Sequence, residues 1–193
     1  MSAVESIQNR SPSIFWGELA PCEHICQIYG DDEVFLDALG GFVSGGLHAD
    51  ESVIVIASEE HIASLDRRLR LGGLDPDRLR GNDRYIVLSA EECLRQFMVN
   101  GWPSDAAFEA FVSGVIGRAR RDDRKVRAFG EMVAVLWAKG HYAATVRLEH
   151  LWNRLLKAEK FPLFCAYPRA GFVRGASEAI SELNAAHTRM VSN

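Results

Sequence analysis

A chain of 193 residues fits one domain and is long enough to bury a core without disulfide or metal staples. Its net charge of −4 argues against a general nucleic-acid-binding protein, which usually carries an excess of basic residues. The sequence has no apolar run long enough to cross a bilayer and no visible signal peptide, so we expect a cytoplasmic protein without a membrane segment.

Residues 1–20 are predicted to form an N-terminal arm. They are polar up to an aromatic segment, Ile14, Phe15 and Trp16, which would anchor the arm through one apolar contact. Residues 21–193 contain no low-complexity linker and no repeat, and we interpret them as a single domain.

Short apolar runs and helical stripes alternate along this domain. Strands are predicted at residues 25–29, 52–57, 85–88, 126–129 and 163–167. Helices are predicted around residues 35–42, 62–69, 108–119, 132–138, 148–156 and 176–190. Gly45-Gly46 and Gly72-Gly73 are expected to end the first two helices, and a break is expected near Gly140. This alternation predicts an α/β fold with a mainly parallel central sheet flanked by helices.

Ligands of such sheets bind beyond the carboxyl ends of the strands. In this sequence those ends fall at residues 29–31, 58–60, 130–131 and 167–169. The candidate ligand-binding residues are therefore Tyr29, Asp31, Glu59, Glu131 and Tyr167. An aromatic ring beside carboxylates suits a polar or cationic small molecule. Tyr29 could instead pack under a loop.

Two of the acidic candidates also have structural interpretations. Glu131 could form an ion pair with Arg127 or Arg147, or place a charge at the start of the next helix. Glu59 fits the first turn of a helix whose N-cap is Ser58.

The turn after the first strand is where a nucleotide-binding protein would carry its phosphate loop. That loop needs the pattern G-x-x-x-x-G-K-[ST], in which glycines let backbone N–H groups surround the phosphates and Lys reaches the terminal phosphates. Residues 29–35 read YGDDEVF, with one glycine, no lysine and three carboxylates. These carboxylates would repel a triphosphate, so we expect no ATP hydrolysis and no catalytic residue.

The cysteines and histidines raise the question of a metal site. His24 and Cys26 lie on one face of the first strand and could bind a metal together with Cys165. Alternatively, Cys26 and Cys165 are small buried hydrophobic residues and His24 lies at the strand start. We favour the second interpretation, with reduced cysteines, no metal and no cofactor. His141, His150 and His187 are assigned no catalytic role.

Two basic runs lie at residues 67–70 and 118–125. Each could dock an acidic partner or nucleic acid, but such runs at helix ends are more often solvated surfaces. We therefore expect no direct binding of nucleic acid.

Five segments of the chain resemble the MEDS domain, the methanogen/methylotroph, DcmR sensory domain. In chain order they are HICQIY at 24–29, GFVSGGLHADESVIVIASEEH at 41–61, VRAFGEM at 126–132, LEHLWNRLL at 148–156 and LFCAYP at 163–168. The resemblance covers roughly residues 20–190, and it is the combination of segments that is specific.

This resemblance implies a RecA-like fold related to the clock-protein ATPases, without a working phosphate loop. It also implies a sensory or regulatory role in prokaryotic signal transduction, as in two-component systems. The domain would bind a small molecule or a partner protein and act on a histidine kinase or a transcription regulator. The C-terminal helix, residues 175–190, would transmit the signal. The alternative function is a nucleotide-dependent RecA-like phosphotransferase or ATPase.

Overall fold

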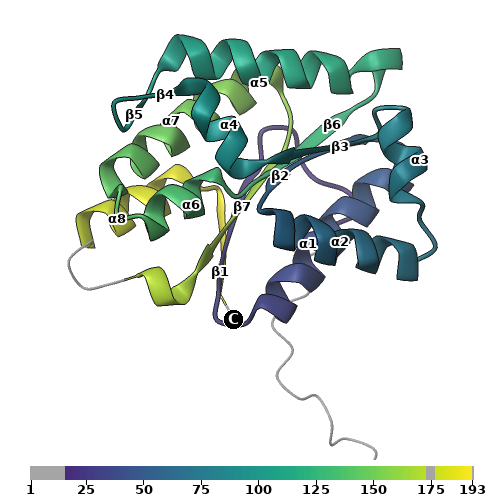
Figure 1. The fold of residues 1–193 in the computed structure, drawn as a ribbon, viewed down its shortest axis with the longest axis horizontal. Helices are drawn as coiled ribbons and strands as arrows, with labels where there is room; N and C mark the ends of the chain where they lie inside the picture. The colour runs from purple at the N-terminus through teal and green to yellow at the C-terminus, as the bar shows by residue number, and fades with distance from the viewer. Residues whose placement is uncertain (1–15, 173–176, 193) are drawn as a thin grey trace, which may run out of the picture.

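The computed structural model describes residues 16–172 and 177–192. Its main sheet has six strands in the order β3-β2-β6-β7-β1-β8, all parallel (Figure 1). The strands of this sheet are β1 (His24–Tyr29), β2 (Ser52–Ala57), β3 (Tyr85–Ser89), β6 (Val126–Gly130), β7 (Leu163–Pro168) and β8 (Arg189–Ser192). The α/β fold with a parallel central sheet is confirmed.

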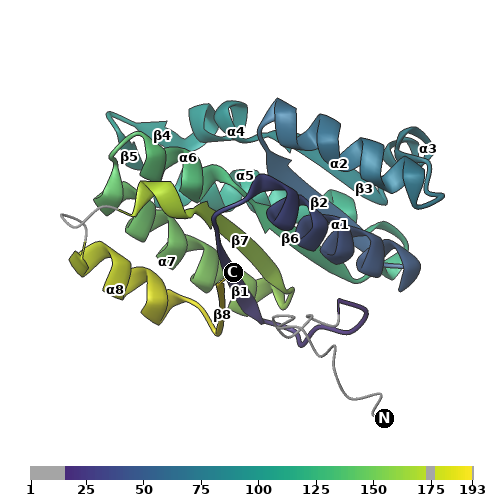
Figure 2. The ribbon, with the colours of Figure 1, turned by 90° about the horizontal axis from the view of Figure 1, so that it is seen from below.

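Helices cover both faces of the sheet (Figures 1 and 2). One face packs against α1 (Asp32–His48), α2 (Glu59–Leu71) and α3 (Pro76–Gly81). The other face packs against α4 (Ala90–Phe97), α5 (Asp105–Ala119), α6 (Met132–Ala138), α7 (Tyr142–Glu159) and α8 (Ser177–Ala186). Because side chains alternate along a strand, neighbouring residues belong to different cores: Ile25 faces the α1–α2 core and Cys26 faces the α4–α8 core.

The five predicted strands are confirmed, and β2 shows why they could be recognised. All six residues of SVIVIA are buried, as expected for a parallel strand covered on both faces. The predicted helices are also present. Gly72 caps α2, Gly73 has a positive φ of 83°, and Gly140, with φ 77°, separates α6 from α7.

The predicted end of the first helix at Gly45-Gly46 is wrong, because α1 continues to His48. These glycines permit close packing and do not break the helix. A Cβ atom on Gly46 would lie 2.6 Å from Nε of Arg127, and one on Gly45 would lie 2.7 Å from the carbonyl oxygen of Trp16. Arg127 is fully buried and cannot easily move away.

The predicted closing helix over residues 176–190 is too long. Within the described residues, α8 ends at Ala186, and residues 189–192 form the edge strand β8, which pairs with β1. The short helices α3 and α4 and the two-residue strands β4 (Met98–Val99) and β5 (Trp102–Pro103) were not predicted either.

The N-terminal segment is tied to the core through Trp16. Its ring packs against Phe42 and Phe164, and its carbonyl oxygen accepts a hydrogen bond from Nη1 of Arg127 at 2.8 Å. Ile14 and Phe15, the other two residues of the predicted anchor, lie outside the described residues. Among the helices that the structure describes, none is long and apolar enough to cross a membrane.

Candidate functional site

Glu131 lies where we expected a functional carboxylate, directly after β6 and at the start of α6. Its Oε2 accepts a hydrogen bond from the backbone N–H of Ser58 at 2.8 Å, and its Oε1 lies 2.9 Å from Nδ1 of His61. The Glu131 side chain is 11% exposed, so it remains within reach of solvent.

The structure rules out the alternative interpretation, in which Glu131 pairs with Arg127 or Arg147. The guanidinium of Arg127 pairs with Glu51 and donates a hydrogen bond to the carbonyl oxygen of Phe42 in α1. Arg147 pairs with Asp105. The side-chain partner of the Glu131 carboxylate is thus the imidazole of His61.

His61, which sequence reasoning did not select, is in the first turn of α2. Its hydrogen bond to Glu131 raises its pKa above the usual value against the opposing effect of burial, and the nearby charges of Asp32 and Glu60 act in the same direction. The imidazole side chain is 15% exposed. The sequence did carry a signal for His61: it is a histidine in the first turn of a helix that starts directly after a strand.

Tyr29 reaches the same place through aromatic contacts. Its ring stacks on Phe35 with centroids 4.6 Å apart, and Phe35 contacts the His61 ring edge-on at 5.0 Å. Burial raises the pKa of Tyr29, and the charges of Glu131 and Asp32 raise it further. We call Tyr29, Phe35, Ser58, His61 and Glu131 the edge cluster. β7 lies between β1 and β6, so the strands ending at Tyr29 and Glu131 are one strand apart.

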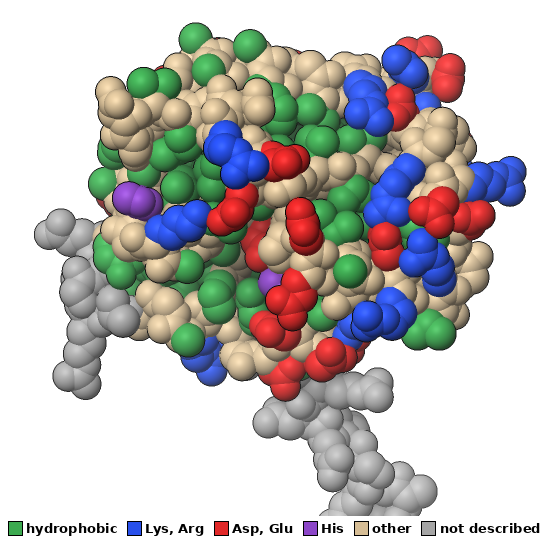
Figure 3. Space-filling model, in the orientation of Figure 1, with side chains coloured by type: hydrophobic (Ala, Val, Ile, Leu, Met, Phe, Trp, Pro, Cys, Tyr) green, Lys and Arg blue, Asp and Glu red, His purple; other side chains and the backbone are tan. Residues whose placement is uncertain are grey.

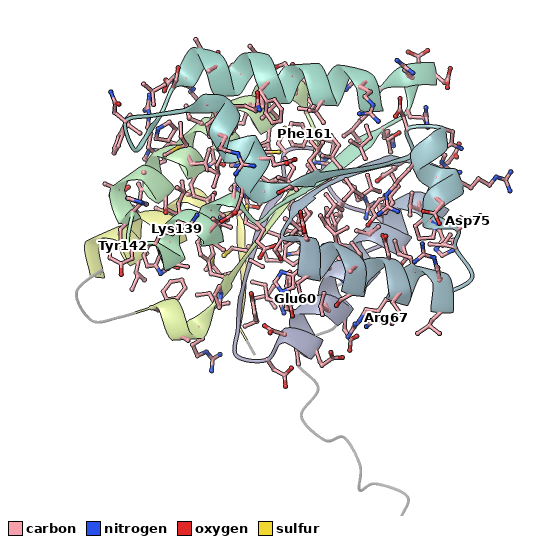
Figure 4. All side chains as sticks on the ribbon, in the orientation of Figure 1. Glu60, Arg67, Asp75, Lys139, Tyr142 and Phe161 are labelled. Carbon is pink, nitrogen blue, oxygen red and sulfur yellow. The ribbon has the colours of Figure 1, made fainter. Side chains whose placement is uncertain are left out.

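Asp31 and Glu59 lie at the starts of α1 and α2, the two helices that carry Phe35 and His61 of the edge cluster. Asp31 is the N-cap of α1 and its carboxylate accepts a hydrogen bond from the N–H of Glu33 at 2.7 Å. Glu59 is exposed in the first turn of α2, behind the N-cap Ser58. Figure 3 shows acidic side chains gathered around this end of the molecule, and Figure 4 labels Glu60 among them. The helix-start interpretation of Glu59 is confirmed, Asp31 is also at a helix start, and both residues add negative charge to this end of the sheet.

The turn between β1 and α1 differs from a phosphate loop in structure as well as in sequence. The N–H group of Glu33, which a phosphate would need, is occupied by the Asp31 carboxylate. A carboxylate at this position also takes the place where the helix dipole favours an anion.

Tyr167 does not join the edge cluster. It is fully buried in β7, and its hydroxyl donates a hydrogen bond to Oε1 of Glu149 in α7. Its ring packs edge-on against Trp137 and Phe172. Tyr167 therefore belongs to the core on the α4–α8 side of the sheet.

Glu149, which accepts the hydrogen bond from Tyr167, is part of a second polar cluster. We call His24, Glu149, Cys165 and His187 the inner cluster; each offers a ligand atom, and these atoms all lie within 4.8 Å of one another. Cys26 pairs in register with Cys165 on the neighbouring strand. All four cysteines have free thiols. Sequence reasoning brought together His24 and Cys165 but missed Glu149 and His187.

Burial and mutual charge govern titration in the inner cluster. Burial lowers the pKa of His24 to about 4. Burial alone would raise the pKa of Glu149, but the neighbouring imidazoles of His187 and His24, with the Tyr167 hydroxyl, outweigh it and lower the pKa to about 2. Glu149 in turn raises the pKa of His187 against the effect of burial. Burial raises the pKa of the Cys165 thiol.

The basic runs are mainly engaged in surface ion pairs. Arg68 pairs with Glu33 and Asp37. In the second run, Arg118 and Arg121 both pair with Asp83. These pairs agree with the interpretation of both runs as solvated helix ends.

Comparison with known proteins gives a family and a fold. The family model described as "MEDS: MEthanogen/methylotroph, DcmR Sensory domain" matches residues 23–188. The search of curated proteins found no match. Among solved structures, a Pyrococcus horikoshii OT3 protein, described as a structural study of project PH0250, is similar with a TM-score of 0.60 and 13% identity. The alignment covers 92% of this chain and 85% of that one.

Proposed function

The chain belongs to the MEDS family of sensory domains, and from this premise we propose that it is a non-catalytic regulatory domain that binds a small polar or cationic molecule at the edge cluster. The observation that carries the proposal is the Glu131 carboxylate at the carboxyl end of a central strand. It is held in place by Ser58 N–H and His61 while part of its surface remains accessible.

The chemistry of the edge favours a cation or a neutral polar ligand over a nucleotide. Asp32 at the start of α1 and Glu60 at the start of α2 act on His61 through their charges, and Asp31 and Glu59 precede them in the chain. Their negative charges attract a cation and repel a triphosphate. The aromatic rings of the cluster add a surface that suits an organic cation.

Output would pass to another protein. In our proposal the ligand stabilises one arrangement of the α1 and α2 starts, and the change in population reaches a histidine kinase or a transcription regulator. The C-terminal segment suits this role, because β8 lies at the sheet edge and pairs only with β1 among the described strands.

Methylammonium, a small organic cation, provides a defined probe. We expect saturable chemical-shift changes at the backbone amides of Tyr29, Ser58 and His61 when it is titrated, and their loss in Glu131→Gln. Magnesium-ATP should cause no such changes and no phosphate release. Failure of methylammonium to shift these amides, or shifts unchanged by Glu131→Gln, would contradict the proposal.

A further inference from the structure

Four separate elements converge on the inner cluster. His24 begins β1, Glu149 lies in α7, Cys165 lies in β7 and His187 follows α8. The side chains of His24, Glu149 and His187 are 0% exposed, and Cys165 is 0% exposed. Residues that bind metals rarely gather by chance in a dry core, because each polar group costs free energy to bury unless it gains a partner.

The two imidazoles are oriented as metal ligands are. Nδ1 of His24 lies 3.1 Å from Oδ1 of Asn153 and 3.2 Å from the carbonyl oxygen of Ala186. Nδ1 of His187 lies 2.6 Å from the carbonyl oxygen of Leu183. Carbonyl oxygens only accept, so each Nδ1 must carry the hydrogen, and each neutral ring presents the lone pair of Nε2 to the cluster.

The atoms that face the centre are under-satisfied. Within the described residues, Oε2 of Glu149 and Nε2 of His187 have no hydrogen-bond partner. Nε2 of His187 lies 3.4 Å from Oε1 of Glu149, and Nε2 of His24 lies 3.5 Å from Oε2, neither with hydrogen-bond geometry. Nε2 of His24 contacts Sγ of Cys165 at 3.4 Å, and the ligand atoms of all four residues lie within 4.8 Å of one another.

The spacing fits a tetrahedral ion. Bond lengths of about 2.0–2.1 Å to nitrogen or oxygen and about 2.3 Å to sulfur place neighbouring ligand atoms of a zinc site about 3.3–3.6 Å apart. The distance from Nε2 of His24 to Sγ of Cys165 is 3.4 Å. Nε2 of His187 lies 3.4 Å from Oε1 of Glu149, and Nε2 of His24 lies 3.5 Å from the other carboxylate oxygen, Oε2. Because the four ligand atoms spread over as much as 4.8 Å, some of them would have to move closer together to enclose such an ion.

The total charge of the four ligands also matches a divalent cation. Two neutral imidazoles, the Glu149 carboxylate and a Cys165 thiolate carry a total charge of about −2, which a divalent cation neutralises. Without a metal, a proton on His187 and the thiol proton of Cys165 would have to balance the site. Binding would release these protons to solvent.

We propose that His24, Glu149, Cys165 and His187 form a closed four-ligand site for a divalent cation of the zinc class. Mixed nitrogen and sulfur ligands select that class over magnesium or calcium. This site is distinct from the edge cluster, and it replaces our expectation of no metal. Because His187 lies between α8 and β8, the ion would tie the C-terminal strand to β1, β7 and α7.

Metal analysis and cobalt spectroscopy on the tag-free protein test the site. We expect about one zinc per chain after purification or reconstitution, and a higher melting temperature with zinc than after chelation. Cobalt should give tetrahedral visible bands with a thiolate charge-transfer band. Cys165→Ser should remove the charge-transfer band, whereas Cys93→Ser, which changes another buried cysteine, should retain it.

A second pair of variants tests the histidine ligand. His187→Gln should lose zinc binding, whereas His150→Gln, which changes an exposed histidine of α7, should bind as the wild type does. If the variants do not fold, the melting curves of wild type with zinc and after chelation still show whether the protein binds zinc. A folded protein that binds no zinc and melts at the same temperature with and without it overturns the proposal, as does an unchanged cobalt spectrum in Cys165→Ser.

Discussion

The edge cluster and the inner cluster each pair a glutamate with histidine, yet their surroundings differ. Glu131 and His61 lie at a strand end with side chains 11% and 15% exposed, whereas Glu149 and His187 are 0% exposed. At the edge, water can replace a lost partner. In the core it cannot, so a lost partner leaves an unpaired buried charge. The same residue types therefore suit recognition in one place and cohesion of the fold in the other.

The largest difference is expected when each glutamate is replaced by leucine. Glu149→Leu removes the acceptor of the Tyr167 hydroxyl and the counter-charge of His187. It should lower the free energy of unfolding by about 3–5 kcal/mol. Glu131→Leu should cost about 1–2 kcal/mol, because Ser58 and His61 can turn to water. Urea unfolding measures both changes in free energy. Equal losses for the two variants would contradict the difference proposed between the two clusters.

The tyrosines provide a milder version of the same comparison. Tyr167→Phe removes a buried hydrogen bond to a carboxylate, and should cost about 1.5–3 kcal/mol. Tyr29→Phe keeps the ring that stacks on Phe35 and should change stability by less than about 0.5 kcal/mol. If Tyr29→Phe were destabilised as much as Tyr167→Phe, the edge cluster would also be contributing to the stability of the fold.

A further small effect on stability is expected to depend on pH. The pKa of His61 is raised in the folded state, so its pairing with Glu131 stabilises the fold fully below the unfolded value of about 6.5. That contribution is lost as pH rises through the folded pKa. The free energy of unfolding of wild type should exceed that of Glu131→Gln by about 0.5–1 kcal/mol near about pH 5.5. Near about pH 8.5 the two values should be almost equal. A difference that grows with pH would contradict this assignment.

The sequence was sufficient for the elements whose own residues determine them. The apolar run Ser52–Ala57 predicted β2, and Gly72-Gly73 marked the end of α2. Gly45-Gly46 was misinterpreted because its purpose is contact with Trp16 and Arg127, which are distant in the chain. β8 was missed because it is short and lies at an edge, where pairing with β1 determines its conformation.

The candidate sites could be predicted only in part. Strand ends identified Tyr29 and Glu131, but the partner His61 comes from a different element. His24 and Cys165 were considered together, whereas Glu149 and His187 depend on how α7 and α8 pack on the sheet. Glu149 carried one usable signal: it lies on the buried helical face that also includes Thr145 and Trp152. A charge on such a face requires a partner.

In our proposal, the edge cluster binds a ligand and contributes little to the stability of the fold. Thermal melts of wild type and Glu131→Gln near about pH 8, each with and without methylammonium, test it most directly. We expect melting temperatures within about 2 °C of each other without the cation, and a rise with the cation in wild type alone. A Glu131→Gln protein that melts well below wild type, yet is stabilised equally by methylammonium, would contradict it.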